Sequence, residues 1–126
     1  MSKLKELDLY NDAIIVFVGD HGWQLGEHNL WAKHCNFQTS LKVPLLIKCP
    51  NQTETKRIKS VVELVDIFPT LCDISNLDYP VHLQGKSLTS VNKKDNSNTI
   101  GFSTYKKGTT ITTSNYSYTK LSLIHI

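Results

Sequence analysis

The chain has 126 residues, a hydrophobic fraction of 40% and a net charge of +3. These values are typical of one small globular domain or a piece of a larger one, and they exclude a disordered tail. Arg57 is the one arginine among 14 basic residues and the lysines are scattered, so nucleic acid is not expected as a partner. No apolar run approaches the roughly 20 residues of a membrane span, so no membrane partner is expected.

The first predicted element is the end of an amphipathic helix over residues 3–10, with Leu4 and Leu7 on one face. This charged start has no apolar core like that of a signal peptide, so secretion is not encoded in it. A periplasmic, secreted or lysosomal location stays open for a longer protein.

A continuous apolar run over residues 13–18 predicts a strand buried on both faces, which is typical of the interior of a parallel α/β sheet. The run stops at Gly19-Asp20-His21-Gly22, which predicts a tight loop at the carboxyl end of the strand. Ligand sites in open α/β sheets lie at this edge.

Residues 23–42 have no clean period and predict a structured loop with at most short helical turns. A second apolar strand is expected over residues 43–49, and Pro44 favours a strand start or a sheet edge because it lacks an N–H donor. Residues 61–74 lead into a helix, with Asp66 as its N-cap and Pro69 in its first turn.

Residues 99–120 are rich in Thr, Tyr and Ser with partial alternation, which predicts antiparallel strands with one solvated face. The composition changes near residue 95. We therefore expect residues 1–95 to belong to an α/β core domain and residues 96–126 to begin a small antiparallel subdomain. Two apolar strands are too few for a sheet, so the sequence predicts an incomplete domain.

Asp20 and His21 supply a carboxylate and an imidazole side by side, which together can hold a divalent cation alongside ligands from elsewhere. A capping Asp beside a hydrogen-bonded His is the more common explanation of such a pair. Lys33 lies twelve residues after His21, and its ammonium suits an oxyanion, although most lysines are simply solvated. His28 is a second candidate for substrate binding, with local hydrogen bonding as its alternative.

Three cysteines are far apart in the sequence: Cys35, Cys49 and Cys72. They contain no Cys-x-x-Cys pair, so a zinc knuckle or a thioredoxin-type site is not expected. Free thiols are the ordinary interpretation, and a single bridge from Cys49 to either of the others stays open.

The stretch from Ile14 to Lys33 resembles the second metal-binding segment of sulfatases in the alkaline phosphatase superfamily, closest to the iduronate-sulfatase-like group. The similarity continues, in order and spacing, through the segments 43–47, 62–71, 84–88 and 112–119. It implies part of an alkaline-phosphatase-like mixed sheet flanked by helices, followed by the antiparallel subdomain.

The resemblance also implies a chemistry, the hydrolysis of sulfate esters of sulfated small molecules or glycans. Asp20 and His21 match ligands of one calcium ion, and Lys33 matches the lysine that contacts the substrate's sulfate. The family's nucleophile is a formylglycine made from cysteine in a Cys-x-Pro/Ala-x-Arg segment. None of the three cysteines here lies in that context, so no catalytic nucleophile is expected in this chain, and the chain alone is expected to be inactive.

Two alternatives stay open. A phosphatase or phosphodiesterase of the same superfamily would use an Asp-His pair for zinc and a Ser or Thr nucleophile. A non-catalytic binding module would need this chain to fold alone. Oligomeric state and the specific substrate are not predicted.

Overall fold

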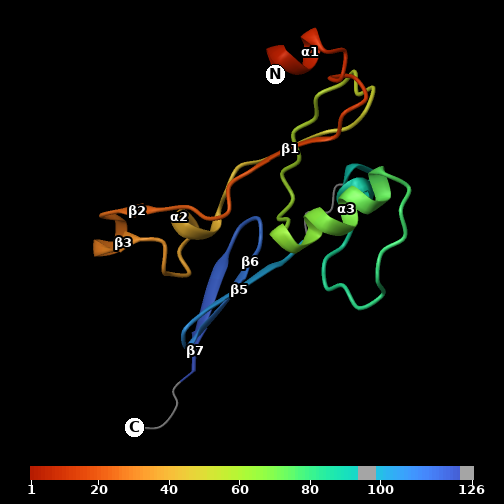
Figure 1. Ribbon diagram of the computed structural model, residues 1–126. Helices are drawn as coiled ribbons and strands as arrows, with labels where there is room; N and C mark the ends of the chain where they lie inside the picture. The colour runs from red at the N-terminus through yellow and green to blue at the C-terminus, as the bar shows by residue number, and fades with distance from the viewer. Residues whose placement is uncertain (94–98, 123–126) are drawn as a thin grey trace. The chain divides into compact units, whose positions relative to one another are not determined.

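The computed structural model of the 126-residue chain describes residues 1–93 and 99–122 (Figure 1). The chain divides into two compact units, Met1–Lys56 and Arg57–Ile126, each with its own elements. In the described ranges no helix is long and apolar enough to cross a membrane. The boundary predicted near residue 95 lies in the range 94–98, outside the described residues, so the division into 1–95 and 96–126 stays a prediction.

The first unit begins with α1 (Ser2–Glu6), which ends earlier than the predicted helix over residues 3–10. Asp8 has a left-handed backbone with φ of 54°, which an α-helix cannot contain. The amides of Leu9 and Tyr10 both donate to the carbonyl of Leu4, so a wide turn replaces the last predicted helical turn.

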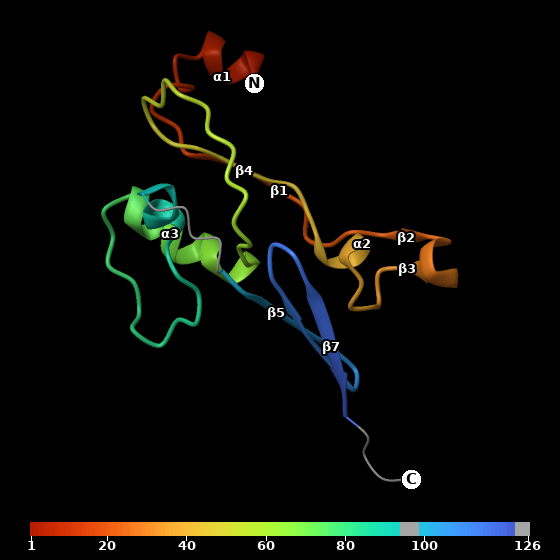
Figure 2. The same cartoon turned by 180° about the vertical axis from the view of Figure 1, so that it is seen from behind.

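The centre of this unit is an antiparallel pair, β1 (Ile15–Val18) with β4 (Leu45–Lys48), which lie side by side in Figure 1 and in the view from behind in Figure 2. Pro44 directly precedes β4, as its missing N–H donor predicted. The Lys48 ammonium donates to the backbone carbonyls of residues 10, 11 and 13, and thereby ties the turn before β1 to the end of β4.

The prediction that β1 is buried on both faces among parallel neighbours is wrong for the described chain. Phe17 is 62% exposed and Val18 is 41% exposed, and the described partner of β1 is antiparallel. A strand is buried on both faces only when it has neighbours on either side and layers above and below. Unit 1 supplies β1 with one neighbouring strand, so its apolar side chains stay exposed.

The predicted loop over residues 23–42 contains short helical turns, as expected, and also a small hairpin that was not predicted. β2 (Gln24–Leu25) pairs antiparallel with β3 (Trp31–Ala32), and η1 (Glu27–Asn29) forms the turn between them. α2 (Gln38–Leu41) follows. Strands of two residues carry no detectable period, which is why the sequence pattern gave no sign of this hairpin.

In the second unit, η2 (Leu64–Asp66) runs directly into α3 (Ile67–Ile74), with Asp66 at the N-cap and Pro69 in the first turn of α3 as predicted. The Asp66 carboxylate, however, does not cap α3. Its Oδ2 accepts from the amide of Glu63 at 2.9 Å, and its Oδ1 accepts from the amide of Lys86 at 2.8 Å. Asp66 therefore holds two other segments against the start of α3.

After η3 (Leu88–Lys93), three antiparallel strands form one sheet in the order β5-β6-β7, which confirms the prediction for residues 99–120. Their bounds are β5 (Gly101–Tyr105), β6 (Gly108–Thr112) and β7 (Ser117–Leu121). Glu63 Oε1 accepts from the amide of Phe102 at 2.7 Å, which links this sheet to η2 within the second unit.

Candidate functional site

The candidate site begins where β1 ends, at Asp20 and His21. The amide of Gly19 donates to the carbonyl of Pro44 at 3.1 Å, which continues the β1–β4 ladder by one more bond. A Cβ at Gly19 would lie 3.2 Å from Pro44 Cδ, so the end of β1 and the start of β4 are in close contact there. The loop that carries Asp20 and His21 therefore leaves from a fixed point at the edge of the pair.

Gly22 holds the other end of this loop against α2. Its amide donates to the Ser40 carbonyl at 2.8 Å, and a Cβ at this position would lie 1.9 Å from the Thr39 carbonyl oxygen. No side chain fits at that separation, because real Cβ atoms do not approach a carbonyl oxygen so closely. The glycine is required by close approach, and it fixes the backbone immediately after His21.

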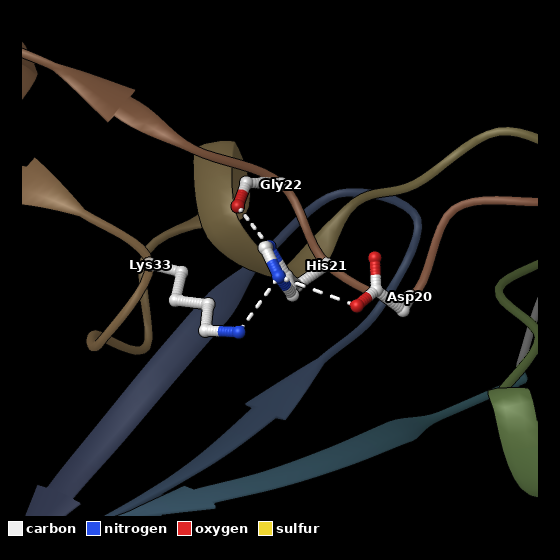
Figure 3. Close-up of polar contacts among 4 residues, drawn as sticks. All are labelled: Asp20, His21, Gly22 and Lys33. Carbon is white, nitrogen blue, oxygen red and sulfur yellow. Dashed lines mark hydrogen bonds and ion pairs between the residues drawn. The ribbon is translucent and has the colours of Figure 1, made fainter.

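The His21 ring has two different polar partners (Figure 3). Its Nδ1 lies 2.8 Å from the Gly22 carbonyl oxygen, and its Nε2 lies 2.8 Å from Lys33 Nζ. A carbonyl only accepts and an ammonium only donates. These two partners fit a ring that donates from Nδ1 and accepts at Nε2.

Asp20 Oδ2 also lies 3.3 Å from His21 Nε2. An ion pair between these groups needs a protonated ring, whereas the contact with Lys33 needs a bare Nε2. Each arrangement satisfies one of the two contacts: a bare Nε2 accepts from Lys33, and a protonated Nε2 donates to Asp20. Asp20 and Lys33 thus approach the same nitrogen from either side of the ring (Figure 3).

Lys33 reaches His21 because of the hairpin. β3 ends at Ala32, which pairs with Gln24 and has a left-handed backbone with φ of 71°. That turn sends the chain back toward the loop after β1, and the amide of Cys35 donates to the Lys33 carbonyl at 2.9 Å. The structure thus brings together Asp20, His21 and Lys33, three of the four predicted site residues.

The donor set suits half of a site for a hard divalent cation. The Asp20 side chain is 87% exposed and the His21 side chain 31% exposed, so both can be approached from solvent. Within residues 1–93 and 99–122, no group of three or more His, Cys, Asp and Glu side chains could hold a metal ion. A calcium ion takes six to eight oxygen ligands, so this pair can contribute to such a site and cannot complete it.

His28 is not in this group of contacts among the described residues. Its ring stacks on Phe37 with 3.9 Å between centroids, and its backbone is left-handed with φ of 56°. Stacking of this kind orders the turn of the hairpin. The structure therefore gives His28 a local packing partner, and its predicted contact with substrate stays a prediction.

The sequence contains no sign of a polar cluster that joins Gln24 and Cys35 to α2. The Gln24 side chain is fully buried, and its amide nitrogen donates to Thr39 Oγ1 and to Cys35 Sγ, the latter at 3.2 Å. Cys35 Sγ also lies 3.1 Å from Ser40 Oγ. Partial burial raises the pKa of the Cys35 thiol, but hydrogen bonds with Ser40, the Phe37 backbone and Gln24 outweigh it, so that the pKa is lowered from 9.0. All three cysteines are free thiols.

Glu27, another polar residue of this loop, makes the local hydrogen bond that is the ordinary role of such a side chain. Its carboxylate accepts from the amide of Leu25 at 2.6 Å. This bond, together with a bond from its own amide, lowers the pKa of the Glu27 carboxyl from 4.5. Glu27 therefore fastens the start of the hairpin that carries Lys33.

Comparison with known families assigns the chain to a family. Residues 26–117 match the family described as N-sulphoglucosamine sulphohydrolase, C-terminal. The chain belongs to this sulfatase family. The matched range includes His28 and Lys33, whereas Asp20 and His21 precede it. The predicted resemblance to sulfatases is thereby confirmed at the level of the family.

Individual sulfatases are similar to this chain over most of its length. Human iduronate 2-sulfatase is 34% identical over 64% of this chain, and arylsulfatase K of Mus musculus is 35% identical over 79%. A sulfatase of Formosa agariphila is 34% identical over 85% of the chain. The matches cover 19%, 18% and 22% of those proteins, so this chain spans roughly a fifth of their length.

Solved structures confirm the predicted fold class. A protein in complex with its substrate D-glucosamine-2-N,6-O-disulfate has a TM-score of 0.77 at 21% identity, over 98% of this chain and 28% of that one. The phosphonate monoester hydrolase of Silicibacter pomeroyi has a TM-score of 0.73 at 22% identity, over 95% and 30%. The sulfatase chain therefore has the mixed α/β fold of part of an alkaline-phosphatase-like domain.

Proposed function

We propose that this chain is the C-terminal part of an enzyme that hydrolyses sulfate esters, and that Asp20, His21 and Lys33 are its contribution to the active site. The observation that carries the proposal is their convergence. A carboxylate oxygen and an ammonium nitrogen lie 3.3 Å and 2.8 Å from one imidazole nitrogen, on a loop fixed by Gly22. Membership of the sulfatase family supports the reaction class.

In this proposal Asp20 and His21 hold one divalent cation, for which calcium is our candidate. When bound, such a cation would supply positive charge that stabilises the anionic sulfate group. Asp20 offers the hard anionic oxygen that such an ion prefers, and His21 offers its Nε2 lone pair. The remaining ligands would come from residues other than those that the structure describes.

Lys33 binds a sulfate oxygen in this account. An ammonium has three donors and a full charge, so it stabilises negative charge that builds up on the oxyanion during ester cleavage. Lys33 lies in the short loop between β3 and α2, and from there its Nζ reaches His21 Nε2. The bond-forming nucleophile, a formylglycine by resemblance, has no counterpart among the three cysteines of this chain.

A sulfated sugar is the substrate class that we propose. The structural neighbour bound to D-glucosamine-2-N,6-O-disulfate, whose fold this chain shares, supports this class. Exposed Trp23 beside the site, with its ring centroid 6.0 Å from that of His21, offers an apolar surface next to the charged groups. The position of the sulfate on the sugar is left open by these observations.

A phosphonate or phosphate ester is the second candidate substrate, because the phosphonate monoester hydrolase of Silicibacter pomeroyi shares the fold. The family match favours sulfate over phosphorus esters.

A non-catalytic binding module is the third possibility. It predicts a monodisperse 126-residue chain with a sharp, reversible melt, whereas exposed Phe17 and Val18 predict aggregation or dye binding.

The test uses the complete reading frame that contains this chain, purified and offered aryl sulfate, aryl phosphate and phosphonate esters. We expect turnover of the sulfate above the other two. The 126-residue chain alone, with a Lys33→Ala control, is expected to give none. A preference for phosphorus esters, or a Ser or Thr in place of the Cys-x-Pro/Ala-x-Arg segment, would replace the proposal by the second candidate.

A further inference from the structure

The sheet of unit 2, made of β5, β6 and β7 (Figure 1), has two faces of different chemistry. Residues directly opposite each other in paired antiparallel strands point to the same face. The register places Phe102, Ile111 and Tyr118 in one row across the three strands. Phe102 is 61% exposed, Tyr118 is 67% exposed, and Ile111 is also exposed. We call the side of the sheet that carries this row the aromatic face.

The opposite face has small side chains, and its centre is buried. Its central row is Ser103, Thr110 and Thr119. Thr110 is fully buried, and its hydroxyl oxygen lies 2.7 Å from that of Thr119. On the same face, a Cβ at Gly101 would lie 3.1 Å from Val61 Cγ1. The sheet therefore packs its small residues against the rest of the chain and leaves its aromatic residues exposed.

Positive charge is concentrated at one end of this sheet. Residues 99–122 contain three lysines, Lys106, Lys107 and Lys120, and no Asp or Glu. The first two form the turn between β5 and β6, and the register puts Lys120 beside that turn. All three are exposed. Lys120 follows Tyr118 by two residues on β7, so its side chain lies on the aromatic face.

Two charged groups near the sheet already have partners. Lys106 Nζ lies 5.4 Å from the centroid of the Tyr105 ring, which belongs to the opposite face. Glu63, the residue before η2, uses its Oε1 to accept from the Phe102 amide. Lys107 and Lys120 are therefore the ammonium groups that we consider for a ligand of the aromatic face.

We propose that the aromatic face binds a sulfated oligosaccharide. Sugar rings lie on the row from Phe102 to Tyr118, and sulfate oxygens accept hydrogen bonds from Lys107 and Lys120. Neighbouring strands are about 4.8 Å apart, so the row spans roughly 10 Å, which is long enough for more than one ring. The inference rests on the proposed function for the class of ligand, a sulfated sugar. It adds a binding surface in unit 2 that uses none of the candidate site residues of unit 1.

Charge complementarity supports this ligand over others. A sulfated sugar has an apolar ring face and fixed anionic groups, and the aromatic face has rings beside ammonium groups. Arginine, whose planar guanidinium suits bidentate phosphate binding, is absent from residues 99–122, so nucleic acid fits less well. An uncharged glycan would leave the lysines without a partner of opposite charge.

The test is the affinity for dextran sulfate, a sulfated glucose polymer, of the complete protein that contains this chain, measured by calorimetry at low salt. Lys107→Gln combined with Lys120→Gln should weaken the Kd about tenfold, because two ammonium contacts are lost. Tyr118→Ser should weaken it about threefold through loss of the ring. Lys59→Gln combined with Lys86→Gln is the matched control, since it removes two exposed charges of the same unit outside the sheet. It should change the Kd by less than about twofold.

Uncharged dextran of the same length and single-stranded polythymidylate of the same charge are the comparison ligands. Both should bind the unaltered protein more weakly than dextran sulfate does. Equal weakening by the two lysine pairs, no binding of dextran sulfate, or tighter binding of polythymidylate would each overturn the inference.

Other occupants of the aromatic face have their own signature. A fall in Tm of more than about 5 °C in Tyr118→Ser would show that another segment of the complete protein packs on this face. A changed oligomeric state of that variant would show that a second copy does. Either result would overturn the inference. Affinity does not depend on turnover, so loss of the sulfatase assignment would leave a measured affinity standing, and unaltered affinities would leave that assignment standing.

Discussion

Two aspartates of this chain, Asp20 and Asp66, show how the same side chain is left open to solvent in one unit and is committed to the fold in the other. Both oxygens of Asp66 accept backbone amides, from Glu63 and Lys86. Asp20 is 87% exposed, and its described polar contact is the His21 ring at 3.3 Å. A carboxylate satisfied by amides is committed to the fold, whereas one left open beside an imidazole can accept a ligand.

Gly22 in unit 1 and Gly85 in unit 2 show the same contrast between an available and a structural neighbour. A Cβ at Gly22 would lie 1.9 Å from the Thr39 carbonyl oxygen, and a Cβ at Gly85 would lie 2.0 Å from the Val65 carbonyl oxygen. In both units a glycine allows two backbone segments to approach more closely than any side chain would permit. Next to Gly22 lies His21, directed at Lys33, and next to Gly85 lies Lys86, whose amide binds Asp66. Close backbone approach therefore does not identify a site, and the side chains beside it must be considered.

The largest expected effect is on stability, from the two glycines. Gly22→Ala and Gly85→Ala should each cost about 3 kcal/mol, because an added Cβ overlaps a carbonyl oxygen and the backbone must shift. Hydrogen exchange of the complete protein that contains this chain should locate the loss in unit 1 for the first variant and in unit 2 for the second. The His21–Lys33 contact should be lost only in Gly22→Ala. Loss of that contact in Gly85→Ala would show that the two loops are not independent.

A smaller loss of stability is expected when the two aspartates are substituted, and it should be larger for Asp66 than for Asp20. Asp66→Asn should cost about 1–2 kcal/mol, since an amide can replace at most one of the two acceptors that bind Glu63 and Lys86. Asp20→Asn should change stability by less than about 0.5 kcal/mol, as expected for an exposed side chain. Urea denaturation of the complete protein and of the same protein with each substitution measures both values. Equal losses would contradict the division between a structural and an available carboxylate.

The smallest expected effect concerns the hairpin that carries Lys33. The pKa of Glu27 is lowered in the folded chain, chiefly by the amide of Leu25. Its contribution to stability is therefore complete above the ordinary value of 4.5 and is lost as the pH falls through the lowered pKa. The Leu25 amide resonance should follow this titration below pH 4.5. In Glu27→Gln the same resonance should not titrate, and a titration that persists there would assign it to another group.

The sequence indicated part of what the structure brings together. Position at the end of an apolar strand made Asp20 and His21 candidates, and the resemblance to sulfatases added Lys33; their contacts are described above, and their roles stay predictions. Gln24 could not be predicted, since nothing in its type or spacing indicates that it is fully buried against Thr39 and Cys35. The burial of a loop residue such as Gln24 depends on which distant segment packs against it. The residues next to it in the sequence do not indicate that segment.

The fold was predictable to a similar extent. The helix start at Asp66 and the antiparallel strands after residue 99 followed from N-cap preferences and alternation. The early end of α1 did not, because the left-handed Asp8 depends on the turn that joins Leu4 to residues 9 and 10. The apolar run of β1 predicted burial that one neighbouring strand cannot provide. An apolar run indicates that a strand is suited to burial on both faces. Whether the strand is buried depends on how many strands and layers surround it.

The most direct test of the account separates metal from substrate in the complete enzyme, by metal analysis and steady-state kinetics on Asp20→Ala, His21→Ala and Lys33→Ala. Asp20→Ala should lose bound cation and lower kcat/KM together by about 10²-fold or more, because it removes the anionic ligand. His21→Ala should do the same more mildly, since a neutral ligand carries no charge. Lys33→Ala should keep the cation and lose turnover. Loss of the cation in Lys33→Ala, or full activity with bound cation in Asp20→Ala, would contradict the assignment.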